Sequence, residues 1–136
     1  MTEFKSSNEV RHIILLVDDE FLIREDLASH LEGCGFTVLQ AGNAIAAIGL
    51  LMQPGCMVDL VFTDVMMPGN MDGLALAKWV MQHRPAVPVI ITTGDVGKAA
   101  AAHELCGTEA VGKPFNYDHV TEKIRTSISR RAAAKS

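Results

Sequence analysis

The segment HIILLV at residues 12–17 is a continuous apolar run that is rich in branched residues. A run of this kind is typical of a strand buried on both faces of a parallel sheet, because a strand with one wet face would alternate with polar residues. Three acids, Asp18, Asp19 and Glu20, follow it at once. The pattern therefore predicts a central strand with carboxylates at its carboxyl end.

The same alternation of short apolar runs and helix-like segments continues along the chain. Further strands are predicted at TVLQA (37–41), LVFT (60–63), VPVIITT (87–93) and AVG (110–112). Helices are predicted at residues 21–32, after Asn43 as far as Met52, after Gly73 as far as Pro85, at residues 95–105 and after Asn116. Five successive β–α units of this kind predict an open, doubly wound α/β sheet with helices on both faces.

Length and composition restrict the class of protein. The 136 residues suit one compact domain, which we expect at residues 12–130 between an extension at 1–11 and a tail at 131–136. A formal net charge of −4 argues against a surface that coats nucleic acid. No apolar run is long enough to cross a membrane, and three widely separated cysteines indicate a reducing cytoplasm rather than a zinc site.

Polar side chains occur where the predicted strands end. Besides the acids after the first strand, these residues are Asp64, Thr92, Thr93 and Lys113. Because the carboxyl ends of parallel strands share one edge of the sheet, we expect these side chains to converge. Each of them has an ordinary explanation alone, such as a helix cap or a surface lysine, but their joint occurrence at strand ends favours a functional site.

The chemistry of such a rim is restrictive. Carboxylates packed together repel one another, and a hard divalent cation relieves the repulsion. Mg²⁺ prefers oxygen ligands and is often shared with a phosphate oxygen. A lysine and a hydroxyl on the same rim would suit a phosphoryl group in transfer.

Four motifs resemble the receiver domain of bacterial two-component response regulators. They are LLVDDE (15–20), VFTDVMMPGNMDG (61–73), PVIITTG (88–94) and GKPF (112–115). Together they cover nearly the whole chain in the family's order. The resemblance implies a five-stranded, flavodoxin-like sheet in the strand order 2-1-3-4-5.

The resemblance also implies a role for each matching residue. Asp64 is the expected phosphoacceptor; Asp18, Asp19 and Asp64, with the backbone carbonyl of Met66, are the expected Mg²⁺ ligands. Lys113 is expected to pair with a phosphoryl oxygen, and Thr93 to be the switch hydroxyl. Phosphorylation would then change the surface formed by the fourth strand, the following helix, the fifth strand and the last helix.

The implied partners are a sensor histidine kinase or histidine phosphotransfer protein as donor and a separate downstream effector, with a homodimer also possible. Neither nucleic acid nor a membrane is an expected partner. The domain is expected to be a signalling phosphoacceptor that loses its phosphoryl group slowly, and not an enzyme that turns over a free substrate.

Two positions depart from the family's pattern. Ala110 stands where an aromatic residue usually lies, three residues before the lysine, so the usual coupling of a ring to the switch threonine is absent. The loop MPGNMDG after the acceptor is one residue longer than the common form, as in many receivers attached to hybrid sensor kinases.

Three other functions remain possible. A receiver fold could serve as a non-phosphorylated dimerisation or docking module, but such relatives typically lose an acid or the lysine. A flavin or nucleotide binder would need a glycine-rich loop after the first strand, where this chain has three acids. An aspartyl phosphohydrolase would need a second acid soon after Asp64, where Val65 and Met66 stand instead.

Overall fold

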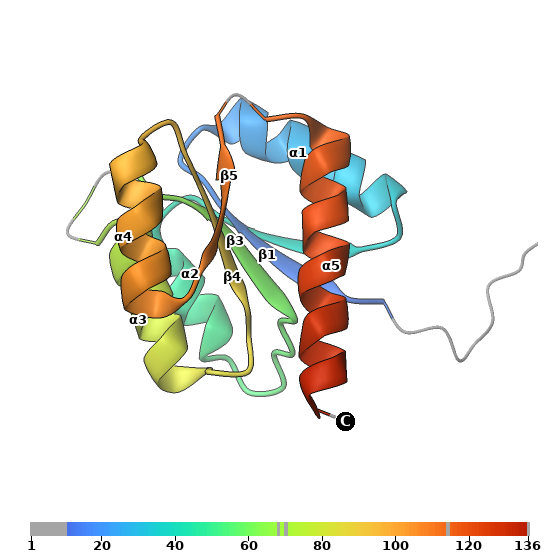
Figure 1. Ribbon diagram of the computed structural model, residues 1–136. Helices are drawn as coiled ribbons and strands as arrows, with labels where there is room; N and C mark the ends of the chain where they lie inside the picture. Colours follow the sequence, from blue (N-terminus) through green and yellow to red (C-terminus); the bar gives the residue numbers. More distant parts are fainter. Residues whose placement is uncertain (1–10, 68, 70, 114, 136) are drawn as a thin grey trace, which may run out of the picture.

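The computed structural model describes residues 11–67, 69, 71–113 and 115–135. In this part of the chain, strands and helices alternate strictly (Figure 1). The strands are β1 (Ile13–Val17), β2 (Thr37–Ala41), β3 (Leu60–Asp64), β4 (Val89–Thr93) and β5 (Glu109–Gly112). The helices are α1 (Phe21–Gly33), α2 (Ala44–Leu51), α3 (Gly73–His83), α4 (Val96–Cys106) and α5 (Tyr117–Lys135).

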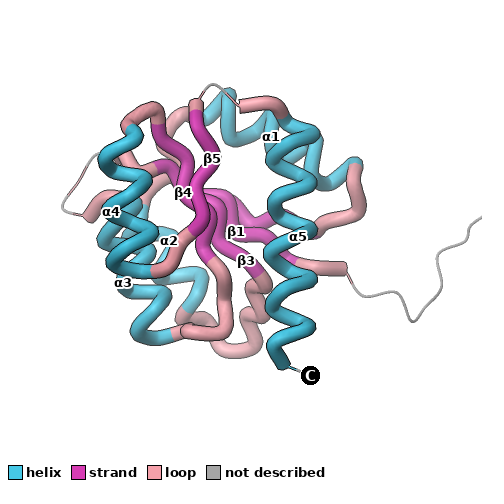
Figure 2. Tube along the Cα trace, in the orientation of Figure 1, coloured by secondary structure: helices cyan, strands magenta, loops and turns pink. Residues whose placement is uncertain are grey.

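All four strand pairings are parallel, and the sheet has the order β2-β1-β3-β4-β5. Figure 2 shows the sheet between two groups of helices. The doubly wound fold and the strand order implied by the resemblance are therefore confirmed.

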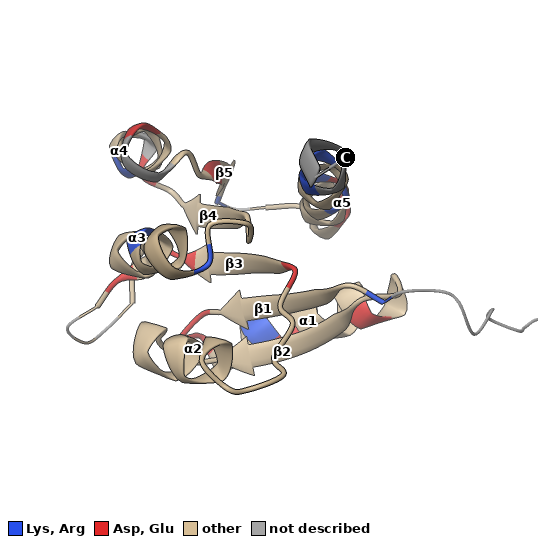
Figure 3. Ribbon diagram, turned by 90° about the horizontal axis from the view of Figure 1, so that it is seen from below, with Lys and Arg blue, Asp and Glu red and all other residues tan. Residues whose placement is uncertain are grey.

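Each face of the sheet carries its own apolar core, because successive side chains of a strand point to opposite faces. On one face, Leu15, Val61 and Ile91 pack with buried residues of α2, α3 and α4. On the other face, Phe62 and Ile90 pack with buried residues of α1 and α5. The view along the sheet in Figure 3 shows α1 and α5 on one side and α2, α3 and α4 on the other.

Helix starts follow the expected capping chemistry. The side chain of Asn43 accepts from the backbone N–H of Ala46 at 2.8 Å, and that of Asn116 accepts from Asp118 at 2.8 Å. Such caps satisfy N–H groups that have no partner within the helix. Both caps were expected from the sequence.

Two boundaries differ from the sequence prediction. Strand β4 begins at Val89 and not at Val87, because the N–H of Val87 donates to Arg84 in a turn and Pro88 has no N–H to give. Helix α5 continues to Lys135, through residues expected to form a tail. Residues 1–10 of the expected extension lie outside the described residues. No helix in the described ranges is both long and apolar enough to span a bilayer.

The backbone beside Asp64 is held by a close approach at the start of α3. The N–H of Gly73 donates to the carbonyl of Val65 at 2.9 Å. A Cβ atom at Gly73 would stand 2.1 Å from the backbone oxygen of Asp64 and 2.7 Å from the Cα of Val65. Only glycine fits this contact without a shift of the backbone that carries Asp64.

We therefore expect Gly73→Ala to lower the free energy of unfolding by about 1–3 kcal/mol or more, the usual effect of overpacking against a backbone that cannot move away. Urea unfolding measures the change. The matched control is Gly49→Ala in α2, because Gly49 is exposed and has nothing within 4 Å of its added Cβ. The control should stabilise the protein by up to about 1 kcal/mol. A Gly73→Ala variant as stable as the wild type would contradict this account of the contact.

Candidate functional site

The carboxyl ends of β1, β3 and β5 meet at one edge of the sheet. Asp18 directly follows β1, Asp64 is the last residue of β3, and Lys113 directly follows β5. The Lys113 Nζ atom lies 2.6 Å from Oδ2 of Asp64. The convergence expected from the strand ends is thus present for these three residues.

Asp64 is the most enclosed acid of the site, with 3% of its surface exposed. Its Oδ1 accepts from the backbone N–H of Met66 at 3.0 Å, and its Oδ2 accepts from Lys113. A buried carboxylate is costly unless it is paired and hydrogen-bonded, and both conditions are met here. The contacts also hold the carboxylate in one orientation.

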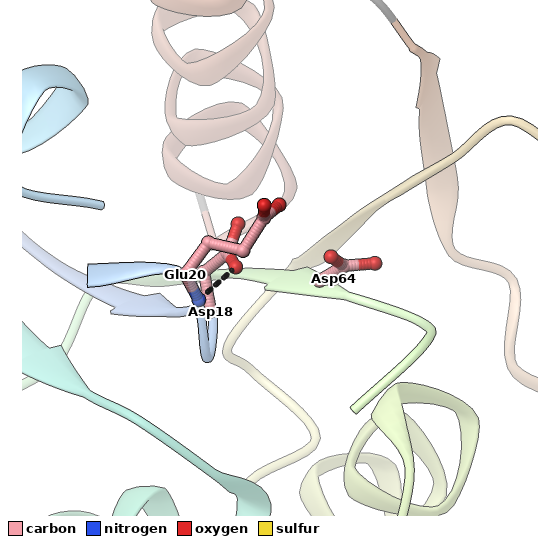
Figure 4. Close-up of side chains that lie close together, drawn as sticks. All are labelled: Asp18, Glu20 and Asp64. Carbon is pink, nitrogen blue, oxygen red and sulfur yellow. Dashed lines mark hydrogen bonds between the residues drawn. The ribbon is translucent and has the colours of Figure 1, made fainter. Parts of the chain in front are cut away.

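Three carboxylates form a cluster at this edge. Oxygen atoms of Asp18, Glu20 and Asp64 all lie within 4.8 Å of one another. Figure 4 shows the three side chains, with the dashed hydrogen bond from the N–H of Glu20 to Asp18, which is 2.9 Å long. Oxygen donors at this spacing, partly buried and uniformly negative, fit a hard divalent cation such as Mg²⁺.

The electrostatics of Asp18 agree with a site for a cation. Burial raises the pKa of its carboxyl, and the negative charges of Asp64 and Glu20 raise it further. The N–H of Glu20 and the charge of Lys113 act in the opposite direction, without cancelling the rise. A divalent cation would remove the penalty that the pKa reports.

The placement of the other expected ligands is less simple. Asp19 is exposed and is not part of the cluster of three, whereas Glu20 is. Sequence reasoning noted Glu20 among the three acids but gave it no role. Its position next to Asp18 and Asp19 could have indicated that Glu20 joins the cluster. The orientation of its side chain, however, depends on the turn between β1 and α1. The roles of Asp19 and of the Met66 carbonyl as ligands stay predictions.

Thr93 lies near the site but is already engaged. It is almost completely buried, and its hydroxyl accepts from the backbone N–H of Asp95 at 3.1 Å. The Asp95 carboxylate in turn accepts from the N–H of Lys98 and caps α4. A movement of Thr93 would therefore change the hydrogen bonds at the start of α4. The switch role of Thr93 stays a prediction.

Comparison with known proteins places these features in a family. Residues 14–125 match the family model described as the response regulator receiver domain. The chain is 36% identical over 123 residues to the DNA-binding transcriptional regulator NtrC of Salmonella typhimurium, and the match covers 88% of this chain and 25% of NtrC. It is 35% identical over 126 residues to the transcriptional regulatory protein FixJ of Bradyrhizobium diazoefficiens, covering 90% of this chain and 60% of FixJ.

Among solved structures, the response regulator TrrA of Thermotoga maritima, in complex with Mg²⁺ and BeF, superposes with a TM-score of 0.76 and 30% identity. That match covers 85% of this chain and 98% of TrrA. The chain thus spans a quarter of NtrC and somewhat over half of FixJ, whereas the match covers nearly all of the TrrA chain.

The raised pKa of Asp18 leads to a prediction for the metal-free protein. In EDTA, we expect Asp18→Asn to raise the free energy of unfolding at pH 7, because the folded protein holds the charged form of Asp18 at a penalty. A raised pKa means that the folded state binds the proton more readily than the unfolded chain, so wild-type stability falls as the pH rises from the ordinary carboxyl pKa to the raised one. The gain from the variant should shrink again as the pH falls to 3.8, the ordinary pKa of an aspartate carboxyl.

The neighbouring exposed residue supplies the control, and Asp19→Asn should change the metal-free stability less than Asp18→Asn. Added Mg²⁺ should reverse the order and stabilise the wild type more than the Asp18 variant, because a ligand that binds only the folded state adds to its stability. Urea unfolding across the pH range measures both effects. An Asp18→Asn variant that is less stable than the wild type at pH 7 in EDTA would contradict the assigned penalty.

Proposed function

This chain belongs to the family of response regulator receiver domains, and from that premise we propose that Asp64 accepts a phosphoryl group from a phosphohistidine. The observation that carries the proposal is the buried Asp64 carboxylate, paired with Lys113 at 2.6 Å and grouped with Asp18 and Glu20. A nucleophile, a counter-charge and a cation site are thereby gathered at the end of a central strand. Phosphoryl transfer depends mainly on such positioning and electrostatic stabilisation.

In the proposed reaction, a carboxylate oxygen of Asp64 attacks phosphorus in line with the bond to the imidazole nitrogen of the donor. A P–O bond forms, and the P–N bond breaks with its electron pair going to the imidazole. The product on Asp64 is an acyl phosphate, which water later hydrolyses to the free carboxylate and phosphate. The ammonium of Lys113 pairs with a phosphoryl oxygen and balances its charge.

The residues that would hold Mg²⁺ are Asp18, Asp19 and Asp64, with the Met66 carbonyl, and Glu20 lies close enough to join them. When bound, the ion supplies positive charge to the phosphoryl oxygens and removes the repulsion among the acids. The clustered oxygens and the raised pKa of Asp18 support this assignment.

The proposed response begins at Thr93. A phosphoryl group adds acceptor oxygens and negative charge, which would attract the Thr93 hydroxyl away from the N–H of Asp95. Because Asp95 caps α4, this exchange loosens the start of that helix and alters the surface of β4, α4, β5 and α5. Ala110 is packed against the core and offers no ring to move, so the backbone around Gly94 and Gly97 carries the change.

A donor protein must cover the rim in order to reach Asp64. Three large apolar side chains close to the acids are exposed. Phe21 and Leu22 come directly after Glu20, and Met66 lies two residues after Asp64. Exposed apolar groups around a buried reactive atom favour contact with a protein over a small free substrate. We assign the donor role to a histidine kinase or phosphotransfer protein and the output to a separate effector.

The domain proper is assigned to residues 12–130, and its place of action to the cytoplasm. The free thiols of Cys34 and Cys56 support a reducing compartment.

Intact mass measurement tests the proposal directly. Incubation with acetyl phosphate and Mg²⁺ should add one phosphoryl group, a gain of about 80 Da, because the acyl phosphate replaces a proton equivalent on Asp64. Asp64→Asn should abolish the gain, since an amide is not a nucleophile here, and EDTA should abolish it in the wild type.

The control variant is Asp118→Asn, which removes a carboxylate that is 91% exposed and should leave the gain of mass unchanged. A wild type that stays unmodified with acetyl phosphate, and also with a competent kinase, would exclude the proposed reaction and favour the docking module.

A further inference from the structure

The hydroxyl of Thr92 on strand β4 is buried and has no role in the proposed reaction. Thr92 is 1% exposed, and its Oγ1 has no hydrogen-bond partner among the described residues. Buried polar groups are nearly always paired, because leaving one unpaired costs free energy. An unpartnered hydroxyl beside a reactive site therefore calls for an explanation.

Strand alternation places Thr92 on the same face of the sheet as Asp64. Phe62 and Ile90 are partners in the register of β3 and β4, and both belong to the core under α1 and α5. Asp64 and Thr92 follow two residues later on the same strands and are again partners in register. Because side chains on a strand return to one face every second residue, Thr92 stands beside Asp64 on that face.

The ion pair of the site crosses β4. Lys113 follows β5 and Asp64 ends β3, and β4 lies between these two strands. Their contact of 2.6 Å must therefore pass over the end of β4, on the face to which Val111 also points. On this face, the last side chain that β4 presents is that of Thr92. The lysine side chain therefore crosses the strand end at which Thr92 stands.

We propose that Thr92 is a positioning residue of the phosphoryl site. Its hydroxyl accepts a hydrogen bond from the Lys113 ammonium when that group moves from the Asp64 carboxylate to a phosphoryl oxygen. This inference rests on the phosphoacceptor role of Asp64.

The chemistry of the lysine explains why the bond belongs to the phosphorylated state. An ammonium has three N–H donors, and in the unmodified protein one of them is taken by Oδ2 of Asp64. Formation of the acyl phosphate neutralises that carboxylate and draws the ammonium towards the phosphoryl oxygens. A hydroxyl that is vacant before the reaction and filled after it favours only the product, since a shift in population requires a contact that differs between the two states.

The two adjacent threonines therefore have different tasks. Thr93 lies two residues after Ile91 and therefore on the face of α2, α3 and α4. Its hydroxyl already accepts a hydrogen bond from the backbone N–H of Asp95. Thr92 lies on the face of the reacting groups and has no such engagement. The first is suited to signal transmission and the second to holding the lysine.

Beryllofluoride, which mimics the phosphoryl group on an aspartate, provides the test. Its affinity in the presence of Mg²⁺ is measured by calorimetry for the full chain and for three variants, Thr92→Val, Thr92→Ser and Thr108→Val. Valine keeps the shape of threonine and removes the hydroxyl, whereas serine keeps the hydroxyl. Thr108 is the matched control, because it is also buried with an unpartnered Oγ1 but precedes β5, at the opposite edge of the sheet.

Thr92→Val should bind beryllofluoride about tenfold more weakly, which is the usual effect of losing a hydrogen bond to a charged group. Thr92→Ser and Thr108→Val should bind within about twofold of the wild type, the scatter expected when no such bond is lost. In metal-free buffer, thermal unfolding of Thr92→Val should occur at or above the wild-type temperature, because an unpartnered hydroxyl is removed. This separates the role in binding from a role in packing.

Equal affinity in the wild type and Thr92→Val would overturn the proposal, as would a Thr92→Ser variant as weak as Thr92→Val. So would a Thr108→Val variant that loses affinity to the same extent, because the effect would then be general. A wild type that binds no beryllofluoride would overturn the proposed function itself, and this inference with it.

Discussion

The buried ion pair between Asp64 and Lys113 is the constraint on which the rest of the site depends. A carboxylate that is 3% exposed at the end of β3 requires a positive partner, and breaking a buried pair by removing one member typically costs about 3–5 kcal/mol, towards the lower end where, as here, the lysine is about a third exposed. That partner comes from β5, two strands away, so the sheet order and register must be right before the charge can be balanced. The close approach of Gly73 to the backbone of Asp64 and Val65 restrains the main chain that carries this carboxylate. Fold and site are thus specified by the same contacts.

Polar contacts also tie α5 to the strand that carries the lysine. Glu109 of β5 receives Arg130 at 2.7 Å and Lys123 at 3.5 Å, both from α5. Arg130 is largely exposed, so its pair contributes little to stability, whereas the pair of Arg131 with Asp59 at 3.1 Å is better shielded. These contacts do more for geometry than for stability. The ion pairs of Glu109 join the first residue of β5, the strand that ends directly before Lys113, to the helix beside it.

The sequence predicted the fold well because the fold follows from periodicity and capping. The apolar runs located all five strands, and Asn43 and Asn116 marked helix starts that the structure has. The errors have local causes: β4 starts two residues late because Pro88 has no N–H, and α5 continues where only a tail was expected. At the site, strand ends located Asp18, Asp64 and Lys113. The orientation of the Glu20 side chain depends on the turn after β1, and the lack of a hydrogen-bond partner for the Thr92 hydroxyl depends on packing. A pattern of residue types shows neither.

The two faces of the sheet divide the work of the site. On the face of α1 and α5, four residues of the site lie two positions after a core residue of the same strand: Asp18, Asp64, Thr92 and Lys113. Thr93 lies two residues after Ile91, which belongs to the core of α2, α3 and α4, and Ala110 packs against the same core. A change at Asp64 must therefore pass around the end of β4 to reach α4, because the strands between the two cores are closely packed. Thr93 is the last residue of β4, its carbonyl accepts from the N–H of Lys113 at 3.3 Å, and its hydroxyl holds the N–H of Asp95. Because alanine stands at position 110, where the family usually has a ring, this strand end is the route by which the proposed phosphorylation of Asp64 would reach α4.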